Sequence, residues 1–258
     1  MTDAFPPWTT SISNADATHL WLRGYDATHL MAAASFTDAI YLLHHGRLPT
    51  AGERRILDAI LIGVSDHGPG SPSAAAARLV ASGSRQAPEA AIAAGVLAIG
   101  DVHGGACMTA MQWMGEWLAE QDPPVPIEQA AADAVRASRA QGTRIPGFGH
   151  RVHREVDPRT DVLIGLAREH GSRGDGVTFM RAVERELAAH VKSLPMNIDG
   201  VIAAVLHDLC CTPLFSKCLF IIGRVAGLSA QVVEEYAERP MRIRIPVRYT
   251  GVPPREAR

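Results

Sequence analysis

The stretch EAAIAAGVLAI, residues 89–99, continues directly into GDVHGGA, residues 100–106, and together they indicate how this chain folds. The first part is alanine-rich, nearly all apolar and bounded by Pro88 and Gly100, which predicts a buried helix. The second part places His103 beside two glycines just beyond that helix. Such glycines let a ligand or another stretch of backbone approach closely, although a helix-ending turn with a hydrogen-bonded histidine explains the same pattern.

Helical patterns extend from this stretch in both directions, and no convincing alternating strand accompanies them. Capping residues and apolar periodicity predict further helices over residues 35–45, 50–64, 127–140, 178–191 and 212–238. The proline-rich residues 122–126 are expected to form a linker, and residues 241–249 a short strand or an extended arm. The sequence therefore predicts an all-α protein.

Composition limits the classes of function. The 258 residues suffice for one or two domains, and a net charge of −2 gives no overall field for nucleic acid or a membrane surface. The first residues lack the basic region and apolar run of a secretory signal, and the longest apolar windows look too short to span a bilayer. We therefore expect a cytoplasmic protein that binds neither nucleic acid nor a membrane.

Cysteine and histidine usage argues against a metal site. The four cysteines form no CxxC pair, so we expect buried, reduced thiols rather than zinc ligands or disulfides: Cys107, Cys210, Cys211 and Cys218. Eleven histidines raise the alternative of a metal-binding helical protein. Its best cluster, His44-His45, points adjacent side chains in different directions on a helix and is typical of a solvated helix end.

A loop rich in glycine and proline, residues 142–159, carries a second candidate histidine, His150. Backbone N–H groups of the loop and the arginines that follow the histidine would suit a phosphate or a carboxylate. A surface loop whose arginines pair with Glu155 and Asp157 explains the same residues, and the loop alone does not decide between the two.

A carboxylate, Asp199, stands in Asn197-Ile198-Asp199-Gly200, just before the apolar run 201–206. An aspartate at such a position usually caps a helix, where the helix dipole stabilises its charge. A partly buried aspartate can instead have a raised pKa and act as a general acid or base. Asp66-His67 likewise ends a helix and is explained by a turn alone.

These motifs become specific when they are taken together and in order. They are Asp66-His67-Gly68-Pro69, His103-Gly104-Gly105-Ala106, Pro146-Gly147-Phe148-Gly149-His150, Asp157-Pro158-Arg159, Asn197-Ile198-Asp199-Gly200, Gly223-Arg224-Val225-Ala226-Gly227 and Glu238-Arg239-Pro240. The set resembles the citrate synthase superfamily over nearly the whole chain, from Arg23 to Gly251.

The resemblance implies a citrate-synthase-like fold in which a large helical domain carries a smaller inserted one, with the active site in the cleft between them. Carried over by motif, residues 1–104 and 200–258 would form the large domain and residues 105–199 the small one. The family works as a dimer at minimum. The resemblance therefore also implies a homodimer, in which Arg239 reaches into the neighbouring subunit's site.

The resemblance also assigns roles. Asp199 would exchange a proton with the acetyl carbon, His103 would donate a hydrogen bond to the thioester oxygen, and His150 would act on the ketone or hydroxyl oxygen. Substrate carboxylates would be bound by His67, Arg159, Arg224 and Arg239. Coenzyme A would be bound by Ile145, Pro146, Gly147 and Arg154. Coenzyme A then enters as part of the substrate, with no tightly bound cofactor and no metal.

Two departures favour one branch of the superfamily. The chain is much shorter than ordinary citrate synthases. Its sequence around His67 and Asp199 is similar to that of citryl-CoA lyases and of the lyase module of ATP-citrate lyase. His103, by contrast, keeps the synthase-like His-Gly-Gly-Ala. We therefore expect cleavage of (3S)-citryl-CoA to acetyl-CoA and oxaloacetate, by a protein that works alone or with a citryl-CoA synthetase as partner.

Other functions stay open at this point. A short citrate synthase would use the same groups in the opposite direction, and a related 3-hydroxyacyl-CoA such as citramalyl-CoA would need only a different pocket. A non-catalytic acyl-CoA-binding regulatory protein is a further alternative. Against it, all three expected catalytic residues are present: His103, His150 and Asp199.

Overall fold

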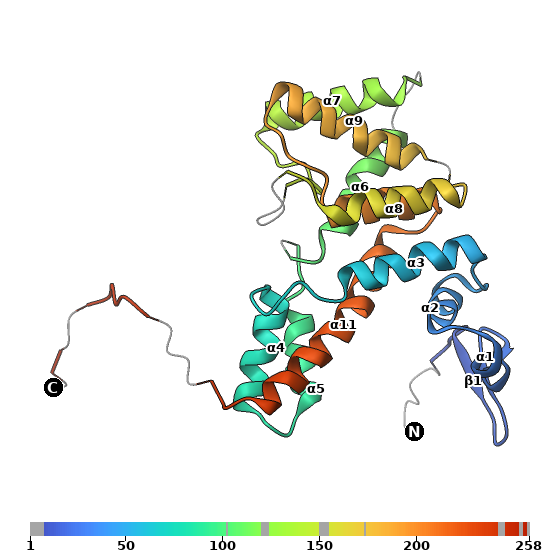
Figure 1. Ribbon diagram of the computed structural model, residues 1–258, viewed down its shortest axis with the longest axis vertical. Helices are drawn as coiled ribbons and strands as arrows, with labels where there is room; N and C mark the ends of the chain where they lie inside the picture. The colour runs from blue at the N-terminus through green and yellow to red at the C-terminus, as the bar shows by residue number, and fades with distance from the viewer. Residues whose placement is uncertain are drawn as a thin grey trace, which may run out of the picture.

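The computed structural model describes residues 8–101, 103–119, 124–149, 155–172, 174–241, 246–252 and 255–256. In these residues the chain forms eleven helices and one small sheet (Figure 1). The helices are α1 Ala27–Ala33, α2 Phe36–His45, α3 Ala51–Val64, α4 Pro72–Gly83, α5 Pro88–Leu97, α6 Ala106–Ala119, α7 Ile127–Gln141, α8 Pro158–Glu169, α9 Asp175–His190, α10 Ile198–Asp208 and α11 Pro213–Ala237. The prediction of an all-α fold is confirmed.

The small sheet was not expected. Its antiparallel strands, in order, are β1 Ser13–Ala15, β2 Leu20–Leu22 and β3 Tyr25–Asp26. The turn between the first two is held by Asp16, whose Oδ1 accepts the backbone N–H groups of Thr18 and His19, both at 2.8 Å. The expectation that no strand is present was wrong here, because strands of two or three residues are too short to show alternation.

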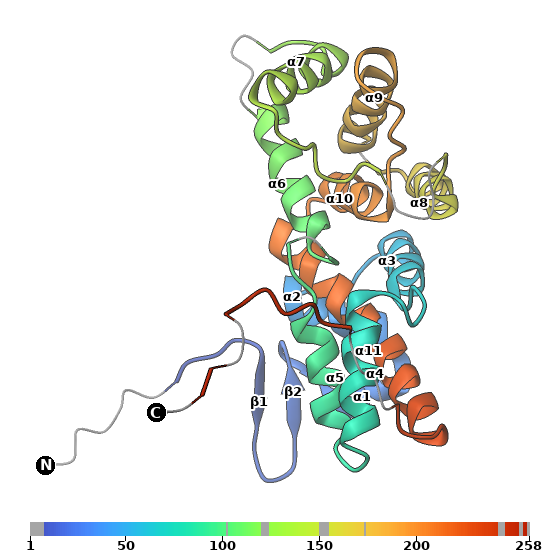
Figure 2. The same cartoon turned by 90° about the vertical axis from the view of Figure 1, so that its left-hand side faces the viewer.

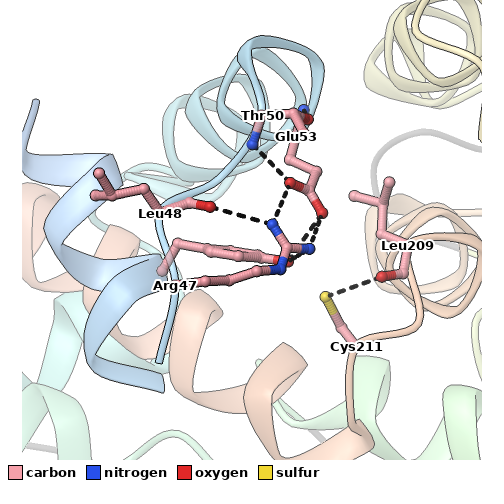
Figure 3. A network of polar contacts seen from close by, with 7 residues as sticks. Arg47, Leu48, Thr50, Glu53, Leu209 and Cys211 are labelled. Carbon is pink, nitrogen blue, oxygen red and sulfur yellow. Dashed lines mark hydrogen bonds and ion pairs between the residues drawn. The ribbon is translucent and has the colours of Figure 1, made fainter. Parts of the chain in front are cut away.

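Local caps set the starts of α2 and α3 where the sequence predicts them. Ser35 and Thr50 each complete a capping box, and at Thr50 the partner is Glu53. The Glu53 carboxylate also accepts two hydrogen bonds from Arg47, at 2.6 and 2.9 Å (Figure 3). It accepts a third from the Tyr41 hydroxyl at 2.9 Å. The bonds from Arg47 lower the pKa of Glu53 to about 2, so the turn between the two helices is fixed by a permanent charge pair.

Helix α9 begins at Asp175 rather than at the predicted residue 178. Its first N–H groups are bound by a side chain from another helix, because the buried Asp208 of α10 accepts Gly176 N–H at 2.7 Å and Val177 N–H at 3.2 Å. A cap supplied from such a distance along the chain cannot be predicted from the local sequence.

Burial of some polar side chains differs from the expectation. The ring of His45 stacks on Tyr41, with centroids 4.2 Å apart, and its Nε2 is buried, so the description of a solvated helix end was wrong for this residue. The four cysteines were expected to be buried, but only Cys107 and Cys211 are, whereas Cys218 is partly buried and Cys210 is exposed.

The helices form two groups that lie one above the other in Figures 1 and 2. The upper group holds α6 to α10, with α7 against α9 and α6 against α10. The lower group holds α1 to α5 and α11, with α4 packed against α5 and α11. The groups are joined because α11 also packs against α6, and α3 packs against α8 and α10. The main core lies across this junction, and a smaller cluster lies between α4, α5 and α11.

Helix α5 is covered on one side only. Its buried residues are Ala91 and Gly95, whereas Leu97 is 85% exposed. The prediction of a buried helix was therefore wrong within this single chain. A sequence that is apolar on every side of a helix does not tell which side its own chain covers.

Helix α11 is long and apolar enough, by length and composition alone, to cross a membrane. This corrects the expectation that no apolar window is long enough. The helix packs against α3, α4, α5 and α6, and 44% of its apolar window is buried by them and their neighbours.

Candidate active site

Helix α10 begins beside Asp199, but Asp199 does not cap it. The N-cap is Asn197, whose Oδ1 accepts Gly200 N–H at 3.1 Å, while its Nδ2 donates to Gly149 O at 2.8 Å. Oδ1 of Asp199 is buried and has no hydrogen-bond partner among the described residues. The interpretation of this aspartate as a helix cap is therefore excluded.

Burial raises the pKa of the Asp199 carboxyl to about 6. The positive charges of Arg159 and Arg224 and the backbone N–H of Cys107 lower this pKa, and the negative charge of Asp157 raises it. The opposing charges therefore offset only part of the effect of burial. A carboxyl with such a pKa exchanges protons close to neutral pH, as a general acid or base must.

The glycine-rich loop, residues 142–159, is described up to Gly149, and this part lies directly against the start of α10. Asn197 N–H donates to Gly147 O at 3.0 Å, and Gly149 N–H donates to Pro195 O at 2.8 Å. Gly147 has a φ of +87°, and a Cβ on it would lie 2.7 Å from Gly200 Cα. The backbone conformation and the close contact both require glycine at this position.

This contact places the loop next to Asp199. The predicted coenzyme A-binding residues in the described part of the loop are Ile145, Pro146 and Gly147. The other residues predicted for this loop, His150 and Arg154, lie outside the described residues. The sequence therefore predicts the proximity of loop and carboxylate, and the structure describes it up to Gly149.

His103 is held by the start of α4. Its Nε2 lies 2.9 Å from Ser73 Oγ and 3.3 Å from Ser73 N. Because a backbone N–H can only donate, Nε2 is the acceptor and the proton of the neutral ring is on Nδ1. Burial lowers the pKa of His103, and the charges of Arg224 and His67 lower it further. His103 is therefore a neutral hydrogen-bond donor through Nδ1.

Ser73 also binds an arginine. Its side chain is fully buried, and its Oγ accepts from Arg224 Nη1 at 3.0 Å. Arg224 itself is 3% exposed, and its Nε donates to Val64 O at 2.7 Å. One serine thus joins His103 to Arg224, two residues that the sequence assigned to different roles.

The second predicted arginine, Arg159, lies at the same end of α3. Its Nη1 donates to Gly63 O at 3.1 Å, and its Nε and Nη2 donate to the Asp157 carboxylate at 2.9 and 2.8 Å. The last carbonyl groups of α3 therefore bind both guanidinium groups, where the negative end of the helix dipole favours positive charge. The structure brings Arg159 and Arg224 together, as predicted.

His67 follows α3 in a loop that α11 holds closely. A Cβ on Gly227 would lie 1.9 Å from Ser65 O, so α11 can approach the end of α3 only with glycine there. The neighbouring Asp66 accepts hydrogen bonds from Gly68 N at 3.0 Å and from Gln231 Nε2 at 3.1 Å. These contacts place His67 close enough for its charge to influence His103.

Arg239 is not part of this group. It follows the end of α11 and is exposed, and no described contact joins it to the other candidate residues. The end of α11 is instead bound by Arg85, which donates to the carbonyl groups of Glu235, Tyr236 and Glu238 at 2.6 to 2.8 Å. Within a single chain, no described contact therefore connects Arg239 with the candidate site.

Three residues of this site were missed by the sequence analysis. Ser73 orients His103, Asp157 binds Arg159, and Cys107 contacts Asp199 through its backbone N–H. Asp157 was noted as an alternative partner for loop arginines and as part of the Asp157-Pro158-Arg159 motif, but no role in the site was predicted for it. Ser73 carried no signal beyond its position just after Pro72 at a helix start, because its partners lie far away in the sequence.

A cavity of about 500 Å³ lies behind the glycine-rich loop, between α7 and α9. Apolar and basic side chains line it, among them Arg139, Arg144, Ile145, Phe148, Leu187 and Leu194. Such a lining suits an organic group that carries negative charge. Among the described residues, no three potential metal-binding side chains lie together.

A buried carboxyl of raised pKa, a neutral histidine donor and two arginines at one helix end lie together, an arrangement that suits acid–base chemistry on a carboxylate. The chain belongs to the citrate synthase family, since the family model for the citrate synthase C-terminal domain matches residues 51–246. The family resemblance predicted from the order of motifs is confirmed.

Solved structures support this at the level of the fold. The citryl-CoA lyase of Hydrogenobacter thermophilus is 39% identical, with a TM-score of 0.86 and 97% of each chain covered. An ATP citrate lyase of Methanothrix soehngenii, solved with citrate and coenzyme A, is 22% identical with a TM-score of 0.83. The match covers 97% of this chain and 43% of that one, and it shows the fold alone.

Curated relatives are longer. The 2-methylcitrate synthase of Shewanella oneidensis is 29% identical over 221 residues, which cover 84% of this chain and 56% of the relative. The citrate synthase of Helicobacter pylori is 28% identical over 209 residues, which cover 75% of this chain and 46% of the relative. This chain therefore spans about half the length of the curated synthases that it matches.

Proposed function

We propose that this chain is a citryl-CoA lyase that cleaves (3S)-citryl-CoA to acetyl-CoA and oxaloacetate. The observation that carries the proposal is the Asp199 carboxyl, whose buried Oδ1 has no partner among the described residues and whose pKa is raised to about 6. Burial therefore makes the protonated form more accessible near neutral pH than it is in an exposed aspartate. Cleavage needs a proton donor at the carbon that becomes the methyl group, whereas synthesis needs a base there.

The reaction would proceed by breaking one carbon–carbon bond. His150 would take the proton from the hydroxyl group, so that a carbonyl forms there and the electron pair of the breaking bond moves to the acetyl-CoA enolate. The Nδ1–H of His103 would stabilise the negative charge on the thioester oxygen. Asp199 would then give its proton to the enolate carbon. The role of His150 stays a prediction, since this residue lies outside the described part of the chain.

Substrate binding follows from the charges around these groups. Arg159 and Arg224, with His67, would bind the carboxylates of the oxaloacetate part, and Arg239 of a second copy would complete the set. Coenzyme A would lie along Ile145–Gly147 and Arg154, next to the cavity behind the loop. Coenzyme A is then part of the substrate, and no other cofactor is proposed.

We also propose a homodimer in the cytoplasm, with the domain division 1–104 plus 200–258 and 105–199. The exposed apolar side of α5, with Leu97 85% exposed, supports an interface, because a second copy would cover it. The exposed position of Arg239 fits a residue that acts in another subunit. Light scattering behind a sizing column tests the oligomer, and a monomer at micromolar concentration would refute it.

The decisive experiment supplies citryl-CoA and identifies the products. Acetyl-CoA with oxaloacetate supports the lyase, whereas free coenzyme A with citrate identifies a short citrate synthase. If the protein turns over citramalyl-CoA but not citryl-CoA, its substrate is a related 3-hydroxyacyl-CoA. If it binds citryl-CoA tightly without any turnover, it is a regulatory protein. Asp199→Asn is the matched variant and should bind citryl-CoA without cleaving it. Whether a citryl-CoA synthetase is a partner is tested by adding one and following the coupled rate.

A further inference from the structure

Asp157 binds both the arginine and the helix that form the site. Its side chain is fully buried. Oδ1 accepts Arg159 N–H at 3.1 Å and Arg159 Nε–H at 2.9 Å, and Oδ2 accepts Arg159 Nη2–H at 2.8 Å. The same Oδ2 accepts the backbone N–H of Ile198 at 3.1 Å. Because Ile198 is the first residue of α10, this carboxylate ties the start of that helix to Arg159.

These bonds also orient Arg159. A guanidinium group has five N–H donors. Among the described contacts, Asp157 takes one on Nε and one on Nη2, and Gly63 O takes one on Nη1. Two donors remain, one on each terminal nitrogen, and a guanidinium group can bind a carboxylate through two such hydrogen bonds.

The charge of Asp157 has a second effect. Asp199 is influenced by Arg159 and Asp157 at the start of α8, by Arg224 of α11 and by the Cys107 N–H of α6. Both arginines favour ionised Asp199, and Asp157 opposes them. If Asp157 were neutral, the charge of Arg159 would act on Asp199 without compensation.

We propose that Asp157 is a positioning residue that fixes Arg159 for substrate binding and offsets its charge, so that Asp199 stays ready to donate a proton. The inference rests on the proposed function for the direction of proton transfer. It adds that carboxylate binding and proton donation depend on one buried aspartate that itself touches no substrate.

Asp157→Asn tests this with little change in shape, because asparagine caps a helix as well as aspartate does. We expect the KM for citryl-CoA to rise about tenfold, since Arg159 loses a charge-assisted partner. We also expect the loss of cleavage at rising pH to begin about one pH unit lower, because a nearby positive charge favours the carboxylate. Asp157→Ser keeps a capping oxygen and should show the same two changes, which covers the case that the asparagine variant folds poorly.

Asp208→Asn is the matched control. Asp208 is a buried aspartate that also binds two backbone N–H groups at a helix start, but it lies at the other end of α10. This variant should leave the KM and the pH profile unchanged, whatever its effect on the Tm. If Asp157→Asn behaves in the same way, Asp157 is only structural and the inference is overturned.

A measurement without turnover separates this inference from the proposed function. An NMR titration of ¹³C-carboxyl-labelled aspartate, with the Asp199 signal assigned from Asp199→Asn, gives the pKa of Asp199 directly. A lower midpoint in Asp157→Asn supports the inference even if the wild type does not cleave citryl-CoA. An unchanged or higher midpoint refutes it even if the wild type is an active lyase.

Discussion

Replacing Asp199 with asparagine should make the protein more stable while it abolishes cleavage. The carboxyl ionises in the unfolded chain near 3.8 and in the folded protein near 6. Below the lower value both states are protonated and the free energy of unfolding is unaffected. As the pH rises from the lower value to the higher one, only the unfolded chain gives up its proton, so the wild type loses stability. Above the higher value the loss is constant.

The size of the effect follows from the two pKa values. The difference of roughly two pKa units, at about 1.4 kcal/mol each, corresponds to about 3 kcal/mol at pH 8. Asparagine has nearly the same shape, keeps an acceptor for the Cys107 N–H and never ionises. Urea unfolding at pH 4, 5, 6 and 8 measures the difference between the two proteins. We expect the variant to gain stability over the wild type as the pH rises and to level off above the folded pKa. If the difference in the free energy of unfolding is the same at every pH, or if the variant is less stable at pH 8, then burial does not raise the pKa of the Asp199 carboxyl.

Three further predictions follow from other contacts. Ser73→Ala removes the hydroxyl that joins the site histidine to the buried arginine, so we expect the unfolding free energy to fall by about 2 kcal/mol and the kcat at least tenfold, measured by urea unfolding and citryl-CoA turnover. Thr37→Val deletes the hydroxyl of another buried residue, on α2, and should lower stability but leave the kcat unchanged. Gly227→Ala should cost more than about 2 kcal/mol in urea unfolding, because its Cβ would overlap a backbone carbonyl, whereas Gly115→Ala has open space and should gain about 0.5–1 kcal/mol; equal effects would contradict the close contact. In wild-type kinetics, cleavage should fall as the pH rises through about 6, because Asp199 then loses the proton that it must donate, and a rise over this range would contradict its role as an acid.

The parts of the fold that depend on neighbouring residues could be predicted from the sequence. Ser35 and Thr50 cap their helices through residues three positions ahead, and both caps were predicted. The start of α9 depends on Asp208, which lies more than thirty residues further along the chain, and was missed. The apolar α5 was expected to be buried, but whether its outer side is covered depends on other chains.

In the candidate site, too, the sequence identified individual residues, whereas their chemical properties depend on packing. The sequence singled out His103 and Asp199 individually, yet each had an ordinary explanation as a turn or a cap, and only the order of motifs joined them. The proton position on His103 depends on Ser73, and the pKa of Asp199 depends on burial by helices from several parts of the chain. These are properties of packing, which no local pattern contains.

The pairing between the glycine-rich loop and the start of α10 has a consequence for how this protein can change in length. The backbone bonds of Gly147 to Asn197 and of Gly149 to Pro195 align the two segments residue by residue, like a very short ladder. Inserting or deleting one residue between Gly147 and Gly149 would shift Gly149 by about 3.3 Å relative to Pro195 and Asp199. Such a shift would break the backbone hydrogen bonds that hold the loop against the start of α10, so we expect changes of length in this chain to be tolerated only in other loops.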